Sequence, residues 1–337
     1  MNKSLHWVDA VKAICMISVY LLHSEAYYGT GGVSYGFFLQ PFYVNAFFFV
    51  SGYLMFRKYM PMLTSDGWYS VGLANLFFRL VVPTLVFSSV IFLPKMIYHG
   101  EGCSAADYIW RVFGGTSYWF TSCLVVAQII LLSLFLSRFR NVWLYTIAAV
   151  ILGGVALLLR MQSDSQFPWY YKSGMLACFF MAMGGMLYYY ESKVLFFMKK
   201  NIFLIIGASI LVVALGGDYY LGFALNTVMG CKMNIPGLLI SLLSIAVLVS
   251  VCLRLPKTKL LEYVGRNSIV FYFFSGVCPA LFGTLLKKYC LWSGYGITVA
   301  CCLLSLLAAY ILCFVIMSWL PWLLDVRKLK IVKNHDK

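Results

Sequence analysis

Three ionisable side chains stand in the first apolar segment of the chain, residues 8–23 (VDAVKAICMISVYLLH), where they could transfer protons or hold an anion. A helix turns about 100° per residue, so Asp9, Lys12 and His23 would share one face. The eleven residues from Lys12 to His23 would span about 16.5 Å along the axis. Because an ionisable group in hydrocarbon costs a few kcal/mol, this face should turn towards other helices or a water-filled cavity.

Each of these side chains has a structural and a functional interpretation. Asp9 and Lys12 are three residues apart, and this spacing is typical of a structural ion pair on a helix near a membrane edge. His23 is either a histidine satisfied at the end of a helix or a working general base, since an imidazole titrates near neutral pH. All three are therefore candidate catalytic residues, and both interpretations stay open.

The composition places these residues in a membrane protein. Apolar residues make up 62% of the 337 residues, charged residues make up 11%, and the mean hydropathy is +0.86. A soluble globular domain has about 25% charged residues, so that class is excluded. Apolar runs of about 20 residues fit transmembrane helices better than the alternating strands of a barrel. We expect one all-α integral membrane domain over residues 1–325 and a basic cytoplasmic tail at 326–337.

Ten apolar segments are predicted to be transmembrane helices. They cover approximately residues 8–24, 37–56, 77–97, 119–137, 142–159, 174–190, 202–215, 235–253, 268–286 and 296–320. The stretch at 219–231 is too short to cross a bilayer and is predicted to be re-entrant or interfacial. Of the 26 basic residues, alternate loops hold 19 on one side and 7 on the other, and this asymmetry predicts that both termini are cytoplasmic.

The predicted loops and helix ends contain further candidates. Arg57 and Arg79 flank one cytoplasmic loop, where they are either topology signals or phosphate ligands. The Ser51-Gly52 pair is a small notch where another helix could approach closely. Trp119 marks an outer membrane interface, and Ser122 lies one turn further in. The formal charge of +15 follows from basic loops next to anionic lipid, and no compact basic patch indicates nucleic acid binding. No metal site is predicted, because one histidine within the membrane offers too few ligands.

These motifs, in their order along the chain, resemble those of the acyltransferase-3 family, bacterial integral-membrane proteins that O-acylate cell-surface glycans. Asp9-x-x-Lys12 and Lys12-x10-His23 are similar to the Asp-x-x-Arg and Arg/Lys-x10-His patterns of the family's first helix. The other matching motifs are FFFVSGYLMF at 47–56, Arg79 with Pro83, Trp119-Phe120, and Gly265-Arg266-Asn267-Ser268 with Tyr272. The chain departs from the family in two places, with Lys12 instead of the commoner arginine and Ser275 instead of a frequent histidine.

The resemblance implies a membrane O-acyltransferase that takes acetyl-CoA or another acyl-CoA from the cytoplasm. His23 would remove a proton from the acceptor hydroxyl or carry the acyl group transiently, while Asp9 would hold Lys12 in place. The residues implied in donor binding are Arg57, Arg79 and Lys12. Those implied near the acceptor are Glu25, Trp119, Ser122 and Tyr272.

The acceptor implied by the resemblance is a surface glycan or a lipid-linked saccharide. The implied location is the bacterial cytoplasmic (inner) membrane, with membrane lipids and the glycan-synthesis machinery as expected partners. Two other functions fit the same residues. A polysaccharide or lipid-linked glycan exporter would also need a cavity with buried charge, and the short stretch at 219–231 would suit a transport path. The third alternative is a non-catalytic partner of a glycan synthase.

Overall fold

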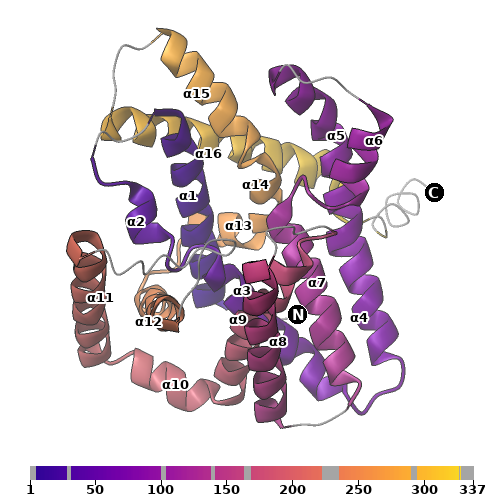
Figure 1. The fold of residues 1–337 in the computed structure, drawn as a ribbon, viewed down its shortest axis with the longest axis vertical. Helices are drawn as coiled ribbons and strands as arrows, with labels where there is room; N and C mark the ends of the chain where they lie inside the picture. Colours follow the sequence, from indigo (N-terminus) through magenta and orange to yellow (C-terminus); the bar gives the residue numbers. More distant parts are fainter. Residues whose placement is uncertain are drawn as a thin grey trace. The chain divides into compact units, whose positions relative to one another are not determined.

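The computed structural model describes residues 5–28, 32–99, 104–137, 141–162, 168–221, 235–289, 294–325 and 327. These residues form helices and connecting turns, and no β-strand occurs among them (Figure 1). The predicted all-α fold is therefore confirmed for this part of the chain.

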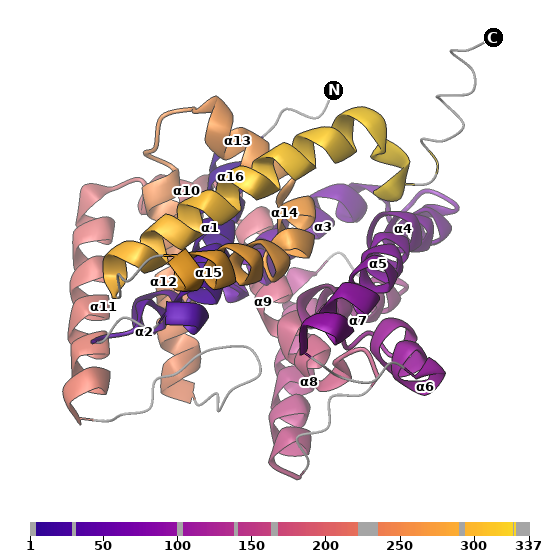
Figure 2. The same cartoon turned by 90° about the horizontal axis from the view of Figure 1, so that it is seen from above.

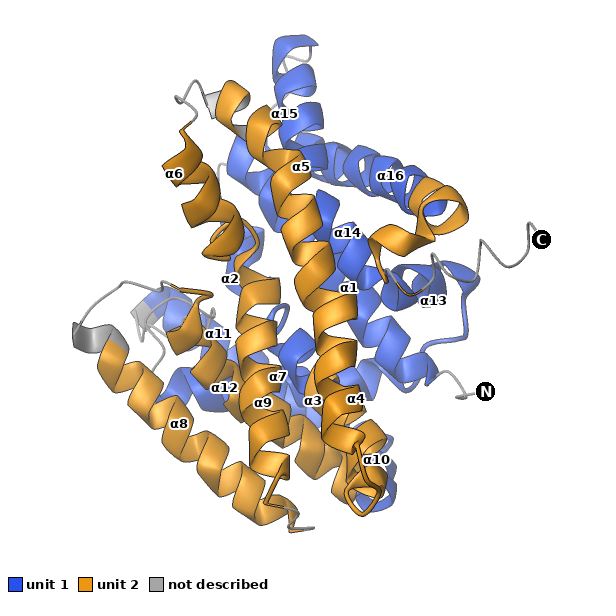
Figure 3. Ribbon diagram, turned by 90° about the vertical axis from the view of Figure 1, so that its right-hand side faces the viewer, with its two compact units in different colours: residues 1–50, 190–314 blue, residues 51–189, 315–337 orange. Residues whose placement is uncertain are grey.

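The chain divides into two compact units, each of which is described by itself. The first unit comprises residues 1–50 and 190–314, and the second comprises residues 51–189 and 315–337 (Figure 3). α3 (Asn45–Tyr59) and α16 (Tyr295–Trp319) belong to both units, because the boundaries at 50 and 314 fall within them. The other helices of the first unit are α1 (His6–Tyr28), α2 (Tyr35–Leu39), α10 (Glu191–Met198), α11 (Asn201–Leu221), α12 (Ile235–Cys252), α13 (Lys259–Arg266), α14 (Ser268–Phe274) and α15 (Val277–Tyr289).

The second unit contains a long interrupted helix and four further helices, together with short turns. The interrupted helix runs from α4 (Trp68–Leu76) through a π-helical turn, η2 (Phe77–Val81), into α5 (Val82–His99). The remaining elements are η1 (Met60–Met62), α6 (Ala105–Tyr108), η3 (Ile109–Phe113), α7 (Trp119–Phe135), α8 (Val142–Gln162), α9 (Tyr171–Tyr189) and η4 (Pro321–Leu323).

α1 is the central helix of the first unit. It packs against α2, α12, α13, α14 and α15, while α11 lies beside α12 (Figure 2). In its most apolar stretch 67% is buried, against 6–44% in the other five helices that could span a membrane. Asp9, Ser18 and Ser24 are among its buried residues, so polar side chains of α1 do turn towards the neighbouring helices.

The second predicted segment, 37–56, is broken into α2 and the start of α3. Turns occupy residues 40–44 between the two helices, and Pro41 lies there. Ser241 of α12 donates a hydrogen bond to the carbonyl oxygen of Pro41, and the Asn45 amide donates to Ser241 Oγ at 2.8 Å. These buried polar contacts satisfy a backbone group that a continuous helix would have satisfied itself.

Close helix contact and an aromatic cluster form the core of the second unit. Ser51-Gly52 was predicted as a notch for a neighbouring helix, and a Cβ atom at Gly52 would collide with the backbone of Met181 in α9. Phe56 contacts the rings of Phe135 and Tyr145, with centroids 4.9 and 5.8 Å away in T-shaped geometry. The predicted notch is therefore confirmed.

Among the described residues, six helices are long and apolar enough to span a bilayer, and the bent pair α14 and α15 would make a seventh. The ten predicted segments coincide with helices over most of their length. However, α3 has 15 residues and α7 has 17, which at 1.5 Å per residue is less than a hydrocarbon core of about 30 Å. The count of ten crossings and the cytoplasmic position of both termini stay predictions. Residues 219–221 continue α11, and 222–231 lie outside the described residues.

Candidate active site

An ion network joins the first half of α1 to α13 through Asp9, Lys12 and Arg266. Lys12 Nζ lies 3.1 Å from Asp9 Oδ1, and Arg266 Nε donates to Asp9 Oδ2 at 3.3 Å. Asp9 is buried, and the Lys12 side chain is 18% exposed. The predicted contact between Asp9 and Lys12 is thus present, and α13 adds a second cation to it.

Gly265 explains why α13 can bring Arg266 to Asp9. A Cβ atom at position 265 would collide with the backbone of Asp9, so only glycine allows the two helices to approach this closely. Arg266 also pairs with Glu262 at 3.0 Å, and His6 Nδ1 lies 3.7 Å from the same carboxylate. Two carboxylates, Asp9 and Glu262, thus lie next to the two cations Lys12 and Arg266.

His23 lies eleven residues after Lys12 on α1, at a distance of about 16.5 Å along the helix. Its Nδ1 atom is 2.6 Å from the carbonyl oxygen of Ser275. Since a carbonyl oxygen only accepts, Nδ1 must carry the hydrogen. The neutral ring then has an unprotonated Nε2, for which the described residues offer no partner, and His23 is exposed. This is the arrangement that a general base requires.

The end of α14 faces α1 around His23. Tyr20 donates its hydroxyl hydrogen to the carbonyl oxygen of Phe271 at 2.7 Å, and Ser275 Oγ donates to that of Tyr272 at 2.8 Å. Tyr272, a predicted acceptor-binding residue, is therefore in the helix that orients His23. Its own side chain is buried, with its ring 6.0 Å from that of Phe273.

Glu25 is bound to the backbone of α2. Its two carboxylate oxygens accept the N–H groups of Tyr35 at 3.1 Å and Gly36 at 3.4 Å, so it caps the first turn of that short helix. Loss of solvent, together with nearby Tyr295 and Glu25, raises the pKa of Tyr35 above its ordinary value. Glu25 follows His23 by two residues on α1 and thus anchors the start of α2 there. It makes no hydrogen bond to the His23 imidazole.

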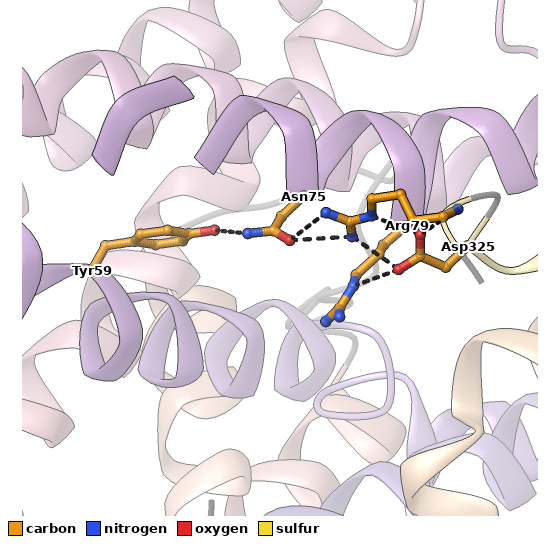
Figure 4. Close-up of polar contacts among 5 residues, drawn as sticks. Tyr59, Asn75, Arg79 and Asp325 are labelled. Carbon is orange, nitrogen blue, oxygen red and sulfur yellow. Dashed lines mark hydrogen bonds and ion pairs between the residues drawn. The ribbon is translucent and has the colours of Figure 1, made fainter. Parts of the chain in front are cut away.

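In the second unit, Asp325 holds two arginines (Figure 4). Its carboxylate accepts Arg79 Nε at 3.1 Å and both Nε and Nη2 of Arg327 at 2.8 Å. Hydrogen bonds from Arg327, and secondly from Arg79, lower the pKa of Asp325 to about 2 although burial opposes the change. Arg327 also donates to Asn75 Oδ1 at 3.3 Å, and the Asn75 amide reaches the Tyr59 hydroxyl at 3.5 Å.

Arg79 and Arg57, the predicted donor ligands, are both exposed in this unit. Arg79 uses only Nε for Asp325, so within the described part of the chain both of its terminal amino groups lack a partner. Its side chain is 62% exposed and projects from the π-helical turn η2. Arg57 Nη1 donates to the Tyr53 hydroxyl at 3.0 Å. Such exposed guanidinium groups can form the paired hydrogen bonds that phosphate accepts.

Trp119 and Ser122 lie in the first turn of α7. Ser122 is fully buried, and its hydroxyl donates to the Gly115 carbonyl oxygen at 2.6 Å. Gly115 has a positive φ of 71° and closes the turn that follows η3. The Trp119 ring lies 6.4 Å from that of Tyr170. Ser122 therefore holds a turn next to Trp119 through its backbone contact.

The predicted site residues thus fall into two groups that the structure describes separately. Asp9, Lys12, His23, Glu25 and Tyr272 belong to the first unit, and Arg57, Arg79, Trp119 and Ser122 belong to the second. Sequence reasoning did not find the roles of Arg266, Asp325 or the Ser275 carbonyl group. One signal existed for Asp325, because it is the only acidic residue between Glu262 and Asp336.

A comparison with known families identifies the family of the chain. A family model described as an acyltransferase domain matches residues 5–325, which is most of the chain. No curated protein and no solved structure matches the chain. The match includes His23, both ion networks up to Asp325, and all the helices described above. The chain is therefore a multi-pass membrane acyltransferase that belongs to the acyltransferase-3 family.

Proposed function

We propose that the protein transfers an acyl group from acyl-CoA to a hydroxyl group of a cell-surface or lipid-linked glycan. Acetyl-CoA is the expected donor, and the bacterial cytoplasmic membrane is the expected location. The observation that supports this proposal best is the hydrogen bond between His23 Nδ1 and the Ser275 carbonyl oxygen. It leaves Nε2 as an exposed base in a protein that belongs to an acyltransferase family.

In the proposed step, Nε2 of His23 takes the proton of the glycan hydroxyl group as its oxygen attacks the thioester carbonyl carbon. The new ester bond forms and the carbon–sulfur bond breaks. The CoA sulfur then receives the proton from Nε2, so that the histidine returns to its starting state. The Ser275 carbonyl stabilises the imidazolium that exists between the two proton transfers, because it accepts from Nδ1 throughout.

The remaining candidates have supporting roles in this proposal. Arg79 and Arg57 bind phosphate groups of the donor through exposed guanidinium nitrogens. Lys12 contributes positive charge, and Asp9 holds its ammonium group in place.

Within each unit, contacts to the backbone keep the candidate acceptor-binding residues in position. Glu25 places the α2 loop after His23, and Ser122 fixes the turn beside Trp119. Tyr272 acts as part of the helix that orients the base.

The test is release of free CoA from acetyl-CoA by purified protein in nanodiscs, with and without host surface glycan. Wild type should release CoA only with glycan, and His23→Ala should lower this release by about 10²- to 10⁴-fold because the base is missing. His335→Ala, a histidine near the end of the sequence, is the matched control and should keep the wild-type rate.

Two results would contradict the proposal at different points. Full release by a folded His23→Ala protein would remove His23 from the mechanism. A wild-type protein that releases no CoA from either acetyl-CoA or succinyl-CoA would argue against acyl transfer to glycan. Glycan transport into vesicles without any acyl donor would then identify an exporter.

The same assay distinguishes a general base from an acyl carrier. An acyl-histidine would form before the acceptor binds, so one CoA per protein would be released in the absence of glycan. We expect no such stoichiometric release, because the proposed base acts only on a bound hydroxyl group. Rapid-quench measurement with radiolabelled acetyl-CoA checks this, and a protein-bound acyl group at His23 would overturn the general-base step.

A further inference from the structure

Pro279 interrupts the helix that contains the hydrogen-bond acceptor of His23. α14 and α15 meet at Ser275 and Gly276 with a bend of 44°. In a continuous α-helix the N–H group of residue 279 would donate to the carbonyl oxygen of residue 275. Proline has no N–H group, and its ring displaces the carbonyl group four residues earlier. Pro279 is buried in the first turn of α15 and therefore accounts for both the bend and the missing hydrogen bond.

The helical pattern resumes directly after this position. The N–H group of Ala280 donates to the carbonyl oxygen of Gly276 at 3.2 Å, so the Ser275 carbonyl alone loses its partner through Pro279. Two earlier carbonyl groups of α14 have side-chain donors, Tyr20 for Phe271 and Ser275 Oγ for Tyr272. The Ser275 carbonyl is therefore the acceptor that Pro279 leaves without its helical donor.

An unpaired carbonyl group inside a membrane protein is costly and must find a donor. α1 packs against both α14 and α15, and from it His23 Nδ1 reaches the Ser275 oxygen at 2.6 Å. The imidazole is therefore the substitute for the amide hydrogen that Pro279 lacks. Because no amide of its own helix competes for it, the Ser275 carbonyl oxygen can hold the hydrogen bond to His23 Nδ1 at all times.

We propose that Pro279 is the positioning residue of His23. By removing one amide hydrogen, it keeps the Ser275 carbonyl available to Nδ1, and this fixes the tautomer with an unprotonated Nε2. The catalytic consequence rests on the proposed function, whereas the tautomer is a property of the protein without substrate. Ser275 replaces a histidine that is frequent at this position in the family. The contact with His23 does not depend on the Ser275 side chain, because the backbone carbonyl makes it.

The test is nitrogen NMR of the full-length protein in nanodiscs, labelled with ¹⁵N in its histidine rings. The chain has only four histidines, so the His23 signals follow from comparison with a His23→Ala spectrum. Wild type should show a protonated Nδ1 and an unprotonated Nε2. In Pro279→Ala the new N–H group should donate to Ser275, and the ring should then distribute between both tautomers.

Two variants control for indirect effects. Pro94→Ala also restores an N–H group within a helix, α5, and should leave the His23 spectrum unchanged. Ser275→Ala keeps the backbone carbonyl and should likewise preserve the wild-type tautomer. If Pro279→Ala does not yield folded protein, Pro279→Gly introduces the same N–H group and gives the same readout.

Glycan-dependent CoA release by these variants completes the test. Pro279→Ala should be slower by about 10- to 100-fold, the loss typical when a hydrogen-bond partner of a metal-bound histidine is removed, while Pro94→Ala keeps the wild-type rate. An unchanged tautomer in folded Pro279→Ala protein would overturn the proposal. So would a changed tautomer with an unchanged rate. Wild type that releases no CoA would overturn the proposed function instead, and the NMR result would still decide the role of Pro279.

Discussion

Each of the two units contains an aspartate, 6% exposed, whose carboxylate is held by two basic side chains. Asp9 pairs with Lys12 and Arg266, and Asp325 pairs with Arg79 and Arg327. The four cations differ in accessibility. The Lys12 side chain is 18% exposed, whereas those of Arg266, Arg79 and Arg327 are 52%, 62% and 40% exposed.

This difference separates a shielded ammonium group, that of Lys12, from three exposed guanidinium groups. Lys12 is a compact ammonium group that is turned towards Asp9 within the helix packing, so its charge mainly compensates the buried carboxylate. Arg79 gives one nitrogen to Asp325 and presents the rest of its guanidinium outwards. The comparison favours Arg79 over Lys12 as the first contact of a donor phosphate group, and the following predictions test it.

The largest effect is expected at Asp9. Asp9→Asn leaves Lys12 and Arg266 without their shared carboxylate and should lower the free energy of unfolding by about 3 kcal/mol. The Michaelis constant for acyl-CoA should also rise, because Lys12 loses its orientation. Unfolding in detergent with increasing denaturant measures the first effect, and donor titration of CoA release measures the second.

Two further variants define the cause. Asp9→Asn combined with Lys12→Met should recover part of the lost stability, since the unpaired charge is then removed. Asp66→Asn, at an exposed turn, should change stability by less than about 0.5 kcal/mol. If Asp9→Asn were as stable as wild type with an unchanged Michaelis constant, the Asp9 network would be needed neither for stability nor for donor use.

The next effect concerns the close contact that brings Arg266 to Asp9. Gly265→Ala introduces a methyl group where the backbone of Asp9 lies, so α13 and α1 must separate. We expect a loss of about 1–3 kcal/mol from this overpacking. Gly216→Ala in α11 is the matched control, because open space surrounds its Cβ position. Equal unfolding curves for the two variants would show that the contact is not required.

A smaller effect is expected at Asp325. Asp325→Asn removes the acceptor that orients Arg79 and should raise the Michaelis constant for acyl-CoA about three- to five-fold, which corresponds to roughly 1 kcal/mol for an ion pair with one exposed partner. The catalytic constant should stay the same, because His23 is not involved. A lowered catalytic constant with an unchanged Michaelis constant would instead indicate a purely structural role for Asp325.

The smallest effect is a dependence on pH. The pKa of Asp325 is lowered to about 2 in the folded protein, whereas an unperturbed aspartate titrates near pH 3.9, at about the unfolded value. Its contribution to stability should therefore be complete above about pH 4 and decrease as the pH falls towards 2. Comparing wild type with Asp325→Asn over this range checks the sign, and a difference that increased on acidification would contradict it.

The sequence alone predicted the features that depend on residue type and local spacing. Asp9 and Lys12 are adjacent on a helix as their spacing requires, and the small residues at 51–52 do admit a neighbouring helix. The all-α fold and the family also followed from local patterns, because apolar runs and motifs lie within short stretches of chain.

The features that sequence reasoning missed depend on backbone groups or on distant pairing. Every residue has a carbonyl group, so nothing in the sequence pointed to Ser275 as the partner of His23 until Pro279 was located one helical turn after it. Asp325 and Arg79 are 246 residues apart, and no local pattern links them. Glu25 lies close to His23 in sequence, yet its carboxylate binds the start of α2.

The π-helical turn η2 has a consequence for how members of this lineage can diverge. A π-helical hydrogen bond encloses one residue more than an α-helical one, so the residues before the turn are rotated by about 100° relative to those after it. Deletion of one residue within 77–81 would therefore rotate α4, which includes Asn75, about the helix axis relative to α5. A one-codon deletion or insertion here would therefore change the direction of Arg79 relative to the helices on either side without any amino-acid exchange.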